Sequence, residues 1–169
     1  MCGIIGIASN KPVSINIINS LKKLEYRGYD SAGLATIKND EINEKKCSGR
    51  VVELEKILFK SPLDGNLGIG HVRWATHGIP NVVNAHPHST EIVSVVHNGI
   101  IENSDELKKN LELKGFKFKS QTDTEVITLL ITEALKKNGP VESVFKTLKH
   151  LKGSFALGII FKNYQNIII

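Results

Sequence analysis

Met1-Cys2-Gly3-Ile4-Ile5-Gly6-Ile7 opens the chain with a cysteine that becomes the first residue if the initiator methionine is removed. The thiol and a free α-amine would then belong to the same residue. The reference pKa of an α-amine is about 7.7–8.0 and that of a thiol about 8.5, so the amine can take the thiol proton near neutral pH. The alternative is a small hydrophobic residue at the start of a buried strand, because free cysteine is commonly buried. The other motifs of the chain decide between the two interpretations.

The composition predicts one compact domain without a membrane or nucleic-acid partner. A chain of 169 residues can bury roughly 70% of its unfolded surface in a single core. The net charge is +5, but the basic residues are scattered pairs with acids between them, which is typical of solvated helix faces. No apolar run approaches the roughly 18 residues of a membrane span, and the start lacks the features of a signal peptide. We therefore expect a cytoplasmic protein.

The cysteines and histidines predict neither a disulfide framework nor a metal site. Cys2 and Cys47 are too few to cross-link a small secreted domain, and a reducing compartment would keep Cys2 as a thiol. The loop histidines that could converge are His71, His77, His86 and His88. Zinc sites usually add cysteine or carboxylate ligands at helical or paired spacing, and that spacing is missing here. We expect hydrogen-bonded loop histidines, with no metal and no cofactor.

Six short apolar runs predict strands, and most are hydrophobic continuously rather than alternately. Continuous hydrophobicity indicates strands that are covered on both faces. The predicted strands are 3–8, 32–37, 67–72, 92–97, 154–161 and 166–169.

Four helical patterns lie between these runs. Their start signals are Ser14, the capping-box pairs Asn103–Glu106 and Thr122–Glu125, and Pro140; Gly28, Gly115 and Gly153 are expected after the ends of the first, second and fourth helices. The apolar positions are Ile15, Ile18 and Leu21 in the first, Leu107 and Leu111 in the second, Val126, Leu129, Leu130 and Leu135 in the third, and Val144, Phe145, Leu148 and Leu151 in the fourth. Because helices cluster between 103 and 152 and strands lie on either side, the order predicts an α+β fold.

Six ordered motifs carry a family resemblance. They are residues 2–7, Tyr26-Arg27-Gly28-Tyr29-Asp30-Ser31-Ala32-Gly33, His71-Val72-Arg73-Trp74-Ala75-Thr76-His77-Gly78, Asn84-Ala85-His86-Pro87-His88, residues 97–103, and Thr122-Asp123-Thr124-Glu125. Together they resemble the class II glutamine amidotransferases, whose glutaminase domains use an N-terminal nucleophile, and within them the branch that aminates fructose 6-phosphate. The resemblance runs from residue 2 to about 161. The second and third motifs separate the chain from phosphoribosylpyrophosphate amidotransferases and asparagine synthetases.

The resemblance implies roles for individual residues. Cys2 attacks the side-chain amide of glutamine, and its own amine carries the proton to the leaving ammonia. The Asn98 side-chain amide and the Gly99 backbone N–H resemble the oxyanion hole. Arg73 resembles the clamp on the substrate carboxylate and Asp123 the acceptor for the substrate ammonium. The further substrate-binding positions are Trp74, Thr76, His77 and His86, and the supporting positions are Arg27 and Gly28.

Each role has a structural alternative when the residue is taken singly. Asn98-Gly99 is also a turn signal, Asp123 also suits the first turn of a helix, and Arg73 also suits a surface ion pair.

By resemblance we expect residues 1–169 to form a four-layer αββα sandwich of the N-terminal nucleophile hydrolase type. The sequence stops at Asn166-Ile167-Ile168-Ile169 within a predicted strand, so we expect C-terminal strands and the sugar isomerase domains to be missing. An unpaired apolar edge would leave such a piece marginally stable or prone to association. Longer members are expected to be homo-oligomers.

The expected activity is the glutaminase half-reaction. The alternatives are a non-catalytic remnant that binds glutamine or a partner chain, and a metal-binding module.

Overall fold

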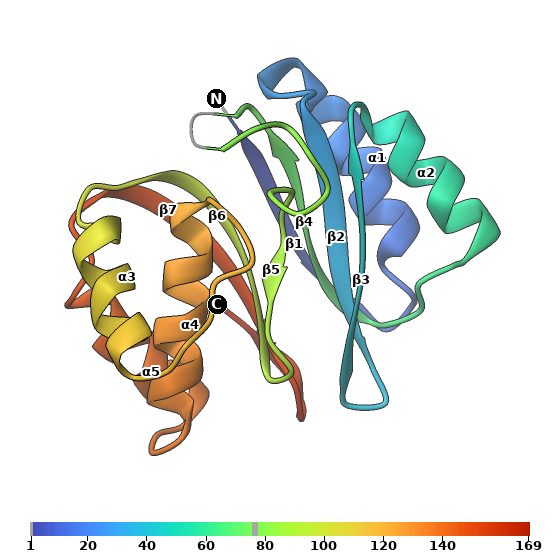
Figure 1. Ribbon diagram of the computed structural model, residues 1–169. Coiled ribbons are helices and arrows are strands. Elements are labelled where there is room, and N and C mark those ends of the chain that lie inside the picture. The colour runs from blue at the N-terminus through green and yellow to red at the C-terminus, as the bar shows by residue number, and fades with distance from the viewer. Residues whose placement is uncertain (1, 76–77) are drawn as a thin grey trace.

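Two antiparallel sheets lie face to face between two layers of helices in the computed structural model, which describes residues 2–75 and 78–169 (Figure 1). The strands are β1 Gly3–Ala8, β2 Ser31–Lys38, β3 Glu41–Ser48, β4 Leu67–Arg73, β5 His88–Ser89, β6 Val93–Ile101, β7 Gly153–Phe161 and β8 Tyr164–Ile168. The helices are α1 Ser14–Leu24, the 3-10 helix η1 Glu25–Arg27, α2 Val51–Lys60, α3 Ser104–Leu113, α4 Asp123–Leu135 and α5 Pro140–Leu148. The expected αββα sandwich is confirmed.

The first sheet has the order β1-β4-β2-β3 and the second the order β5-β6-β7-β8. Helices α1 and α2 cover the first sheet, and α3, α4 and α5 cover the second (Figure 1). Every residue of β4 is buried because the other sheet covers its second face, as its continuous hydrophobicity predicts. The layer between the sheets is built from Ala35, Ile37, Leu67, Ile69, Val96 and Ile160. The strands around β4 and β6 therefore form a rigid base for the loops at their ends.

Three elements were not predicted from the sequence. Strand β3 is polar along most of its length because it is an edge strand, paired only with β2. Strand β5 is two residues long, too short for a periodic signal. Helix α2 does carry a helical pattern, since Val51 and Leu54 are buried one turn apart. The prediction missed it because no capping residue precedes Val51.

The four predicted helices begin within one residue of their expected starts, but three of the predicted side-chain caps were wrong. The Ser14 hydroxyl donates to the Leu63 carbonyl and caps nothing. Asn103 donates to the His150 carbonyl at 2.9 Å and accepts from the Lys152 N–H at 2.9 Å, so it ties α3 to the chain before β7. Tertiary partners outcompete the local caps for these polar side chains.

The third predicted cap that is wrong is the Thr122–Glu125 capping box. The Glu125 carboxylate accepts the backbone N–H groups of Lys119 and Ser120 at 2.9 and 2.6 Å, and Thr122 makes no side-chain cap. Pro140 does open α5, as predicted.

The inward faces of two helices also differ from the prediction. Ile15 and Phe145 are 59% and 63% exposed, and Ile17 occupies the buried place in α1. Gly153, expected to follow the last helix directly, instead begins β7 at a φ of +129°, while α5 ends at Leu148.

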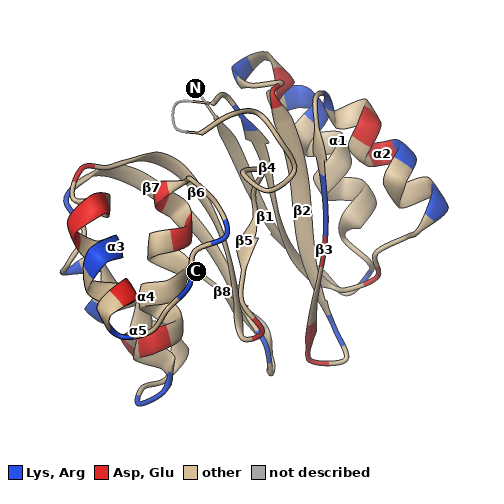
Figure 2. Cartoon of the chain, in the orientation of Figure 1, with Lys and Arg blue, Asp and Glu red and all other residues tan. Residues whose placement is uncertain are grey.

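Charged residues lie mainly on the outer helices and the loops, where Lys and Arg are interspersed with Asp and Glu (Figure 2). Among the described residues, no helix has the length and apolar content that crossing a membrane requires.

Candidate active site

Backbone contacts hold Cys2 beside the end of β4. Gly3 pairs with Val72 in the antiparallel register, so Cys2 lies opposite the residues that follow it. The Trp74 N–H donates to the Cys2 sulfur at 3.3 Å, and the thiol is 3.6 Å from the Trp74 carbonyl oxygen. The Arg27 Nε donates to the Cys2 carbonyl at 3.2 Å. These contacts fix the position of the Cys2 sulfur, as a reacting group in a site requires.

The 26–33 motif forms the support for this segment. A Cβ on Gly28 would lie 2.6 Å from the Arg73 carbonyl carbon and 2.7 Å from the Trp74 nitrogen, so only glycine fits without a shift. The Asp30 carboxylate accepts the Ala75 N–H at 2.8 Å, and the Asp30 N–H donates to the Arg73 carbonyl at 3.0 Å. Arg27 thus contacts Cys2 itself, whereas Gly28 lies against the Arg73–Trp74 backbone beside Cys2.

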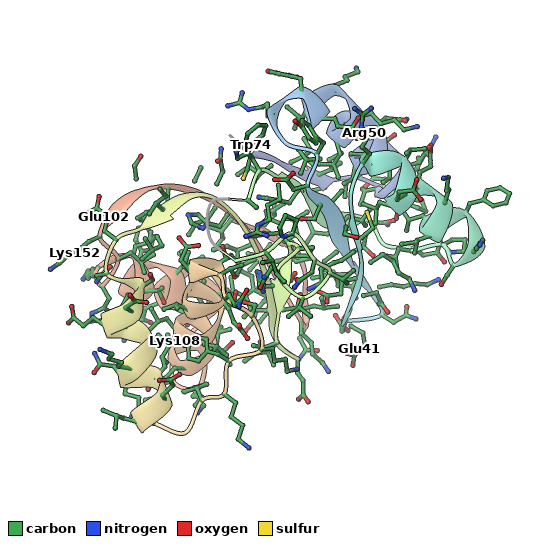
Figure 3. All side chains as sticks on the ribbon, turned by 45° about the horizontal axis from the view of Figure 1, so that its top comes forward. Glu41, Arg50, Trp74, Glu102, Lys108 and Lys152 are labelled. Carbon is green, nitrogen blue, oxygen red and sulfur yellow. The ribbon has the colours of Figure 1, made fainter. Side chains whose placement is uncertain are left out.

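Trp74 is 45% exposed at the end of the sheets where the N-terminus lies (Figure 3). Its ring meets that of Tyr29 edge to face, with centroids 5.7 Å apart. This contact joins the loop after β4 to the 26–33 motif a second time.

Residues from five parts of the chain meet at one small cavity. It is lined by Cys2, Arg73, Trp74, His86, His97, Gly99, Thr122, Asp123 and Thr124. Its volume is about 20 Å³, which holds roughly one water molecule. A broader open hollow is lined by Asp30, Ala75, Gly78, Ile79, Pro80 and Gln121, of which Ala75 and Gln121 adjoin cavity residues in the chain. The cavity is therefore smaller than an amino acid.

The cavity presents a cation and an anion. Burial lowers the pKa of Arg73, while nearby Cys2, Asp30 and Asp123 act in the opposite direction. Asp123 begins α4, where its Oδ2 accepts the Ile101 N–H at 2.9 Å. Opposite charges on the wall of one cavity suit a zwitterionic ligand, such as the α-amino-acid end of glutamine.

Gly99 lines the cavity at a φ of +146°. A Cβ there would lie 2.1 Å from the Ser154 carbonyl oxygen. Glycine is therefore needed at this position for close packing against β7 as well as for its backbone angle. Asn98 is half-buried on β6 and pairs with Ala156, and it is not among the cavity-lining residues. Its oxyanion role stays a prediction. Thr76 and His77, predicted to bind substrate, lie outside the described residues.

Buried imidazoles form a second part of the site. The rings of His71 and His86 stack at 4.1 Å, and His88 meets His86 edge to face at 4.9 Å. Burial lowers the pKa of His71 and that of His88 to about 3, and it lowers the pKa of His86 well below its ordinary value. These three rings are therefore neutral near pH 7. Within the described residues, no group of three or more His, Cys, Asp or Glu side chains is arranged to bind a metal ion.

The sequence prediction gave no role in the site to His97, Thr122, Thr124 or Gly33. The first three line the cavity. Gly33 allows close approach of the 84–88 motif, because a Cβ there would lie 2.1 Å from the His86 carbonyl oxygen. The motifs that contain these residues were the available signal, but the prediction assigned roles in them to Asn98, Gly99, Asp123, Arg27 and Gly28 instead.

Comparison with known proteins defines the class. The family model of the glutamine amidotransferase domain matches residues 81–169. The chain belongs to the glutamine amidotransferase family.

Among curated proteins, the chain is 51% identical over 170 residues to a glutamine–fructose-6-phosphate aminotransferase (isomerizing) of Mesorhizobium japonicum. It is 52% identical to the protein of the same name in Brucella abortus. Each match covers 100% of this chain and 28% of the relative, so the chain spans about a quarter of the length of these relatives.

Solved structures agree on the fold and class. The glutamine phosphoribosylpyrophosphate amidotransferase of B. subtilis matches with a TM-score of 0.81 at 27% identity, over 96% of this chain and 35% of that one. A glutamine aminotransferase class-II domain protein of Silicibacter pomeroyi matches with a TM-score of 0.63 over 95% of this chain and 72% of that one. At 14% identity, this second likeness supports the fold alone.

Proposed function

We propose that residues 1–169 act as one glutaminase domain, which hydrolyses L-glutamine to glutamate and ammonia through a γ-glutamyl thioester on Cys2. The observation that carries this proposal is the meeting of the Cys2 thiol, the Arg73 guanidinium and the Asp123 carboxylate at one cavity. A nucleophile and two opposite charges are the minimum set for presenting the side-chain amide of an amino acid to a thiol.

The chemistry proceeds in two steps. The Cys2 amine takes the thiol proton, and the thiolate attacks the amide carbon of glutamine, which places negative charge on the amide oxygen. Asn98 and the Gly99 N–H donate to that oxygen. The Cys2 ammonium then gives its proton to the amide nitrogen, and the carbon–nitrogen bond breaks so that ammonia leaves. Water adds to the thioester with the amine as base, and glutamate leaves as the thiol is restored.

Substrate recognition is assigned to the groups away from the reacting amide. Arg73 binds the α-carboxylate through two parallel N–H groups, and Asp123 accepts hydrogen bonds from the α-ammonium. Trp74, Thr76, His77 and His86 complete the substrate pocket. Arg27 and Gly28 act indirectly, because they hold the Cys2 and Trp74 backbones in register.

The names of the curated relatives extend the proposal. In a longer protein, sugar isomerase domains would transfer the ammonia to fructose 6-phosphate and so form glucosamine 6-phosphate. We place this protein in the cytoplasm, and we expect the longer members of the family to be homo-oligomers.

The test is ammonia release from glutamine by the purified chain, with mass spectrometry of its N-terminus. Cys2→Ala should abolish release, and Cys47→Ala is the matched control because Cys47 is buried under α2, away from the cavity. Asn98→Ala should lower turnover by roughly 10²–10³ with nearly unchanged glutamine binding. Chain without Met1 that binds glutamine yet releases no ammonia would instead support the non-catalytic remnant.

A further inference from the structure

One buried hydroxyl links two imidazoles at the cavity. Thr124, the second residue of α4, has no exposed surface. Its Oγ1 lies 2.7 Å from His86 Nε2 and 2.9 Å from His97 Nδ1. His97 lies on β6 and His86 precedes β5, so the hydroxyl joins three segments that line the cavity.

Hydrogen counting couples the tautomers of the two rings. A threonine hydroxyl has one hydrogen, so it can donate to only one of the two ring nitrogens and must accept from the other to satisfy both. Donation to His86 Nε2 requires the His97 proton on Nδ1. Donation to His97 Nδ1 requires the His86 proton on Nε2. A third arrangement, in which both rings donate, leaves the hydroxyl hydrogen without an acceptor in a buried place.

The outer nitrogens do not distinguish the first two arrangements. His86 Nδ1 and His97 Nε2 are buried, and neither has a hydrogen-bond partner among the described residues. The first arrangement leaves an N–H unpaired on His86, and the second leaves one unpaired on His97. Since each leaves one unpaired donor, the choice depends on the group that faces His97 Nδ1.

Asp123 makes that choice. Its Oδ1 is 3.7 Å from His97 Nδ1, so an N–H there faces a carboxylate oxygen while a lone pair would be repelled by it. The carboxylate is fixed in place, because its Oδ2 accepts the Ile101 N–H at 2.9 Å. The His97 carbonyl is also fixed, since it accepts from His71 Nε2 at 2.9 Å. The first arrangement is therefore favoured.

We propose that Thr124 is a positioning residue, whose hydroxyl holds His97 as the Nδ1–H tautomer facing Asp123 and thereby keeps the Asp123 carboxylate oriented toward the cavity. The tautomer assignment stands on the geometry alone. Its effect on substrate binding rests on the proposed function, in which Asp123 binds the glutamine ammonium.

Nitrogen-15 NMR of histidine-labelled chain near pH 7.5 tests the tautomers directly. The protonated and bare nitrogens of a neutral imidazole are well separated in such spectra. In the wild type, we expect the His97 proton on Nδ1 and the His86 proton on Nδ1. A wild-type His97 protonated on Nε2, or a His86 protonated on Nε2, overturns the proposal without any variant.

Thr124→Val removes the hydroxyl at nearly constant shape and should give mixed tautomers at His86, whose Nε2 loses its donor, while Asp123 still favours the Nδ1–H of His97. Thr124→Ser should restore the wild-type pattern at His86. Thr128→Val is the matched control, because Thr128 is also buried on α4 but its hydroxyl is directed at the backbone carbonyls of Thr124 and His88. It should leave the tautomers unchanged. Wild-type tautomers in Thr124→Val would refute the role of the hydroxyl.

Kinetics separate this proposal from the proposed function. Thr124→Val should raise KM for glutamine roughly 3–10-fold, a weakening of substrate binding comparable to the loss of one hydrogen bond, with a smaller effect on kcat and on Cys2 alkylation by iodoacetamide. Thr124→Ser should recover most of the loss. If the tautomers are as expected but the chain has no glutaminase activity, the tautomer assignment holds and the proposed function is wrong. If the tautomers differ from the expectation in an active chain, the proposed function holds and the tautomer assignment is wrong.

Discussion

Lowering the pH from about 7.5 to about 5.5 should destabilise the folded chain, because its buried imidazoles stay neutral while the same histidines bind protons in the unfolded state. The pKa of His71 and that of His88 are about 3 in the folded chain, and the pKa of His86 is shifted in the same direction. An unfolded histidine has a pKa of about 6.5. The stabilising contribution is therefore complete above pH 6.5 or so and is lost progressively as the pH falls toward 3.

The expected size follows from the difference in bound protons. At a pH of about 5.5, one unit below the unfolded pKa, each histidine that stays neutral costs the folded state about 1.4 kcal/mol. His71 and His88 together give about 3 kcal/mol, and His86 adds to the same direction. That is a large share of the roughly 5–15 kcal/mol that stabilises an ordinary domain.

Urea unfolding at the two pH values, followed by circular dichroism, measures the difference in the free energy of unfolding. His88→Gln should reduce that difference by about 1.4 kcal/mol, whatever it costs at neutral pH. His150→Gln should leave it unchanged, because His150 is exposed at the end of α5. Equal stability at both pH values, or a His88→Gln chain with the full wild-type difference, would refute the reasoning.

Three further changes test the site. Arg73→Lys loses the planar fork and Asp123→Asn the negative charge, so each should raise KM for glutamine roughly 10–100-fold while alkylation of Cys2 by a small reagent persists; unaffected saturation by glutamine would show that the charges are misassigned. Gly28→Ala should cost about 1–3 kcal/mol of stability and lower glutaminase turnover. Its control is Gly139→Ala, which should do neither, because a Cβ on Gly139 meets nothing within 4 Å. Equal behaviour of the two variants in urea unfolding and turnover assays would contradict the steric argument. Chain that keeps Met1 has no free amine at Cys2 and should be inactive, so full activity in chain shown by mass spectrometry to retain Met1 would exclude the α-amine as the base.

The layers of the fold could be predicted from the sequence because the continuous hydrophobicity of the central strands indicates that both of their faces are buried. β4 is apolar along most of its length and buried at every residue, so one segment established that both faces of its sheet are covered. β3 could not be found in this way, since an edge strand exposed on one side has the composition of a loop. Helix ends were harder for a different reason. Asn103 has the right side chain for a cap, but its amide bonds to two residues more than 45 positions away.

The site was predictable to the extent that its motifs could be matched to a family. Cys2, Arg73, Gly99 and Asp123 are far apart in the sequence, and the structure brings them to one cavity. The imidazole network could not be predicted from spacing. Whether a loop histidine is buried beside Thr124 depends on the packing of the 84–88 motif against β2, which only Gly33 permits and which no local pattern reports.

In this geometry, different groups position Cys2 and face the charges of the substrate. Cys2 is placed by contacts that each involve a main-chain group: the Trp74 N–H donates to the Cys2 sulfur, and the Arg27 side chain donates to the Cys2 carbonyl. In the proposed function, the substrate charges are matched by the side chains of Arg73 and Asp123, and neither side chain makes the Trp74 and Arg27 contacts to Cys2. Loss of a side-chain charge should therefore weaken glutamine binding while the thiol stays reactive. A shift of the Trp74 backbone, as Gly28→Ala would cause, should instead reduce thiol reactivity itself, because it moves the donor that faces the sulfur.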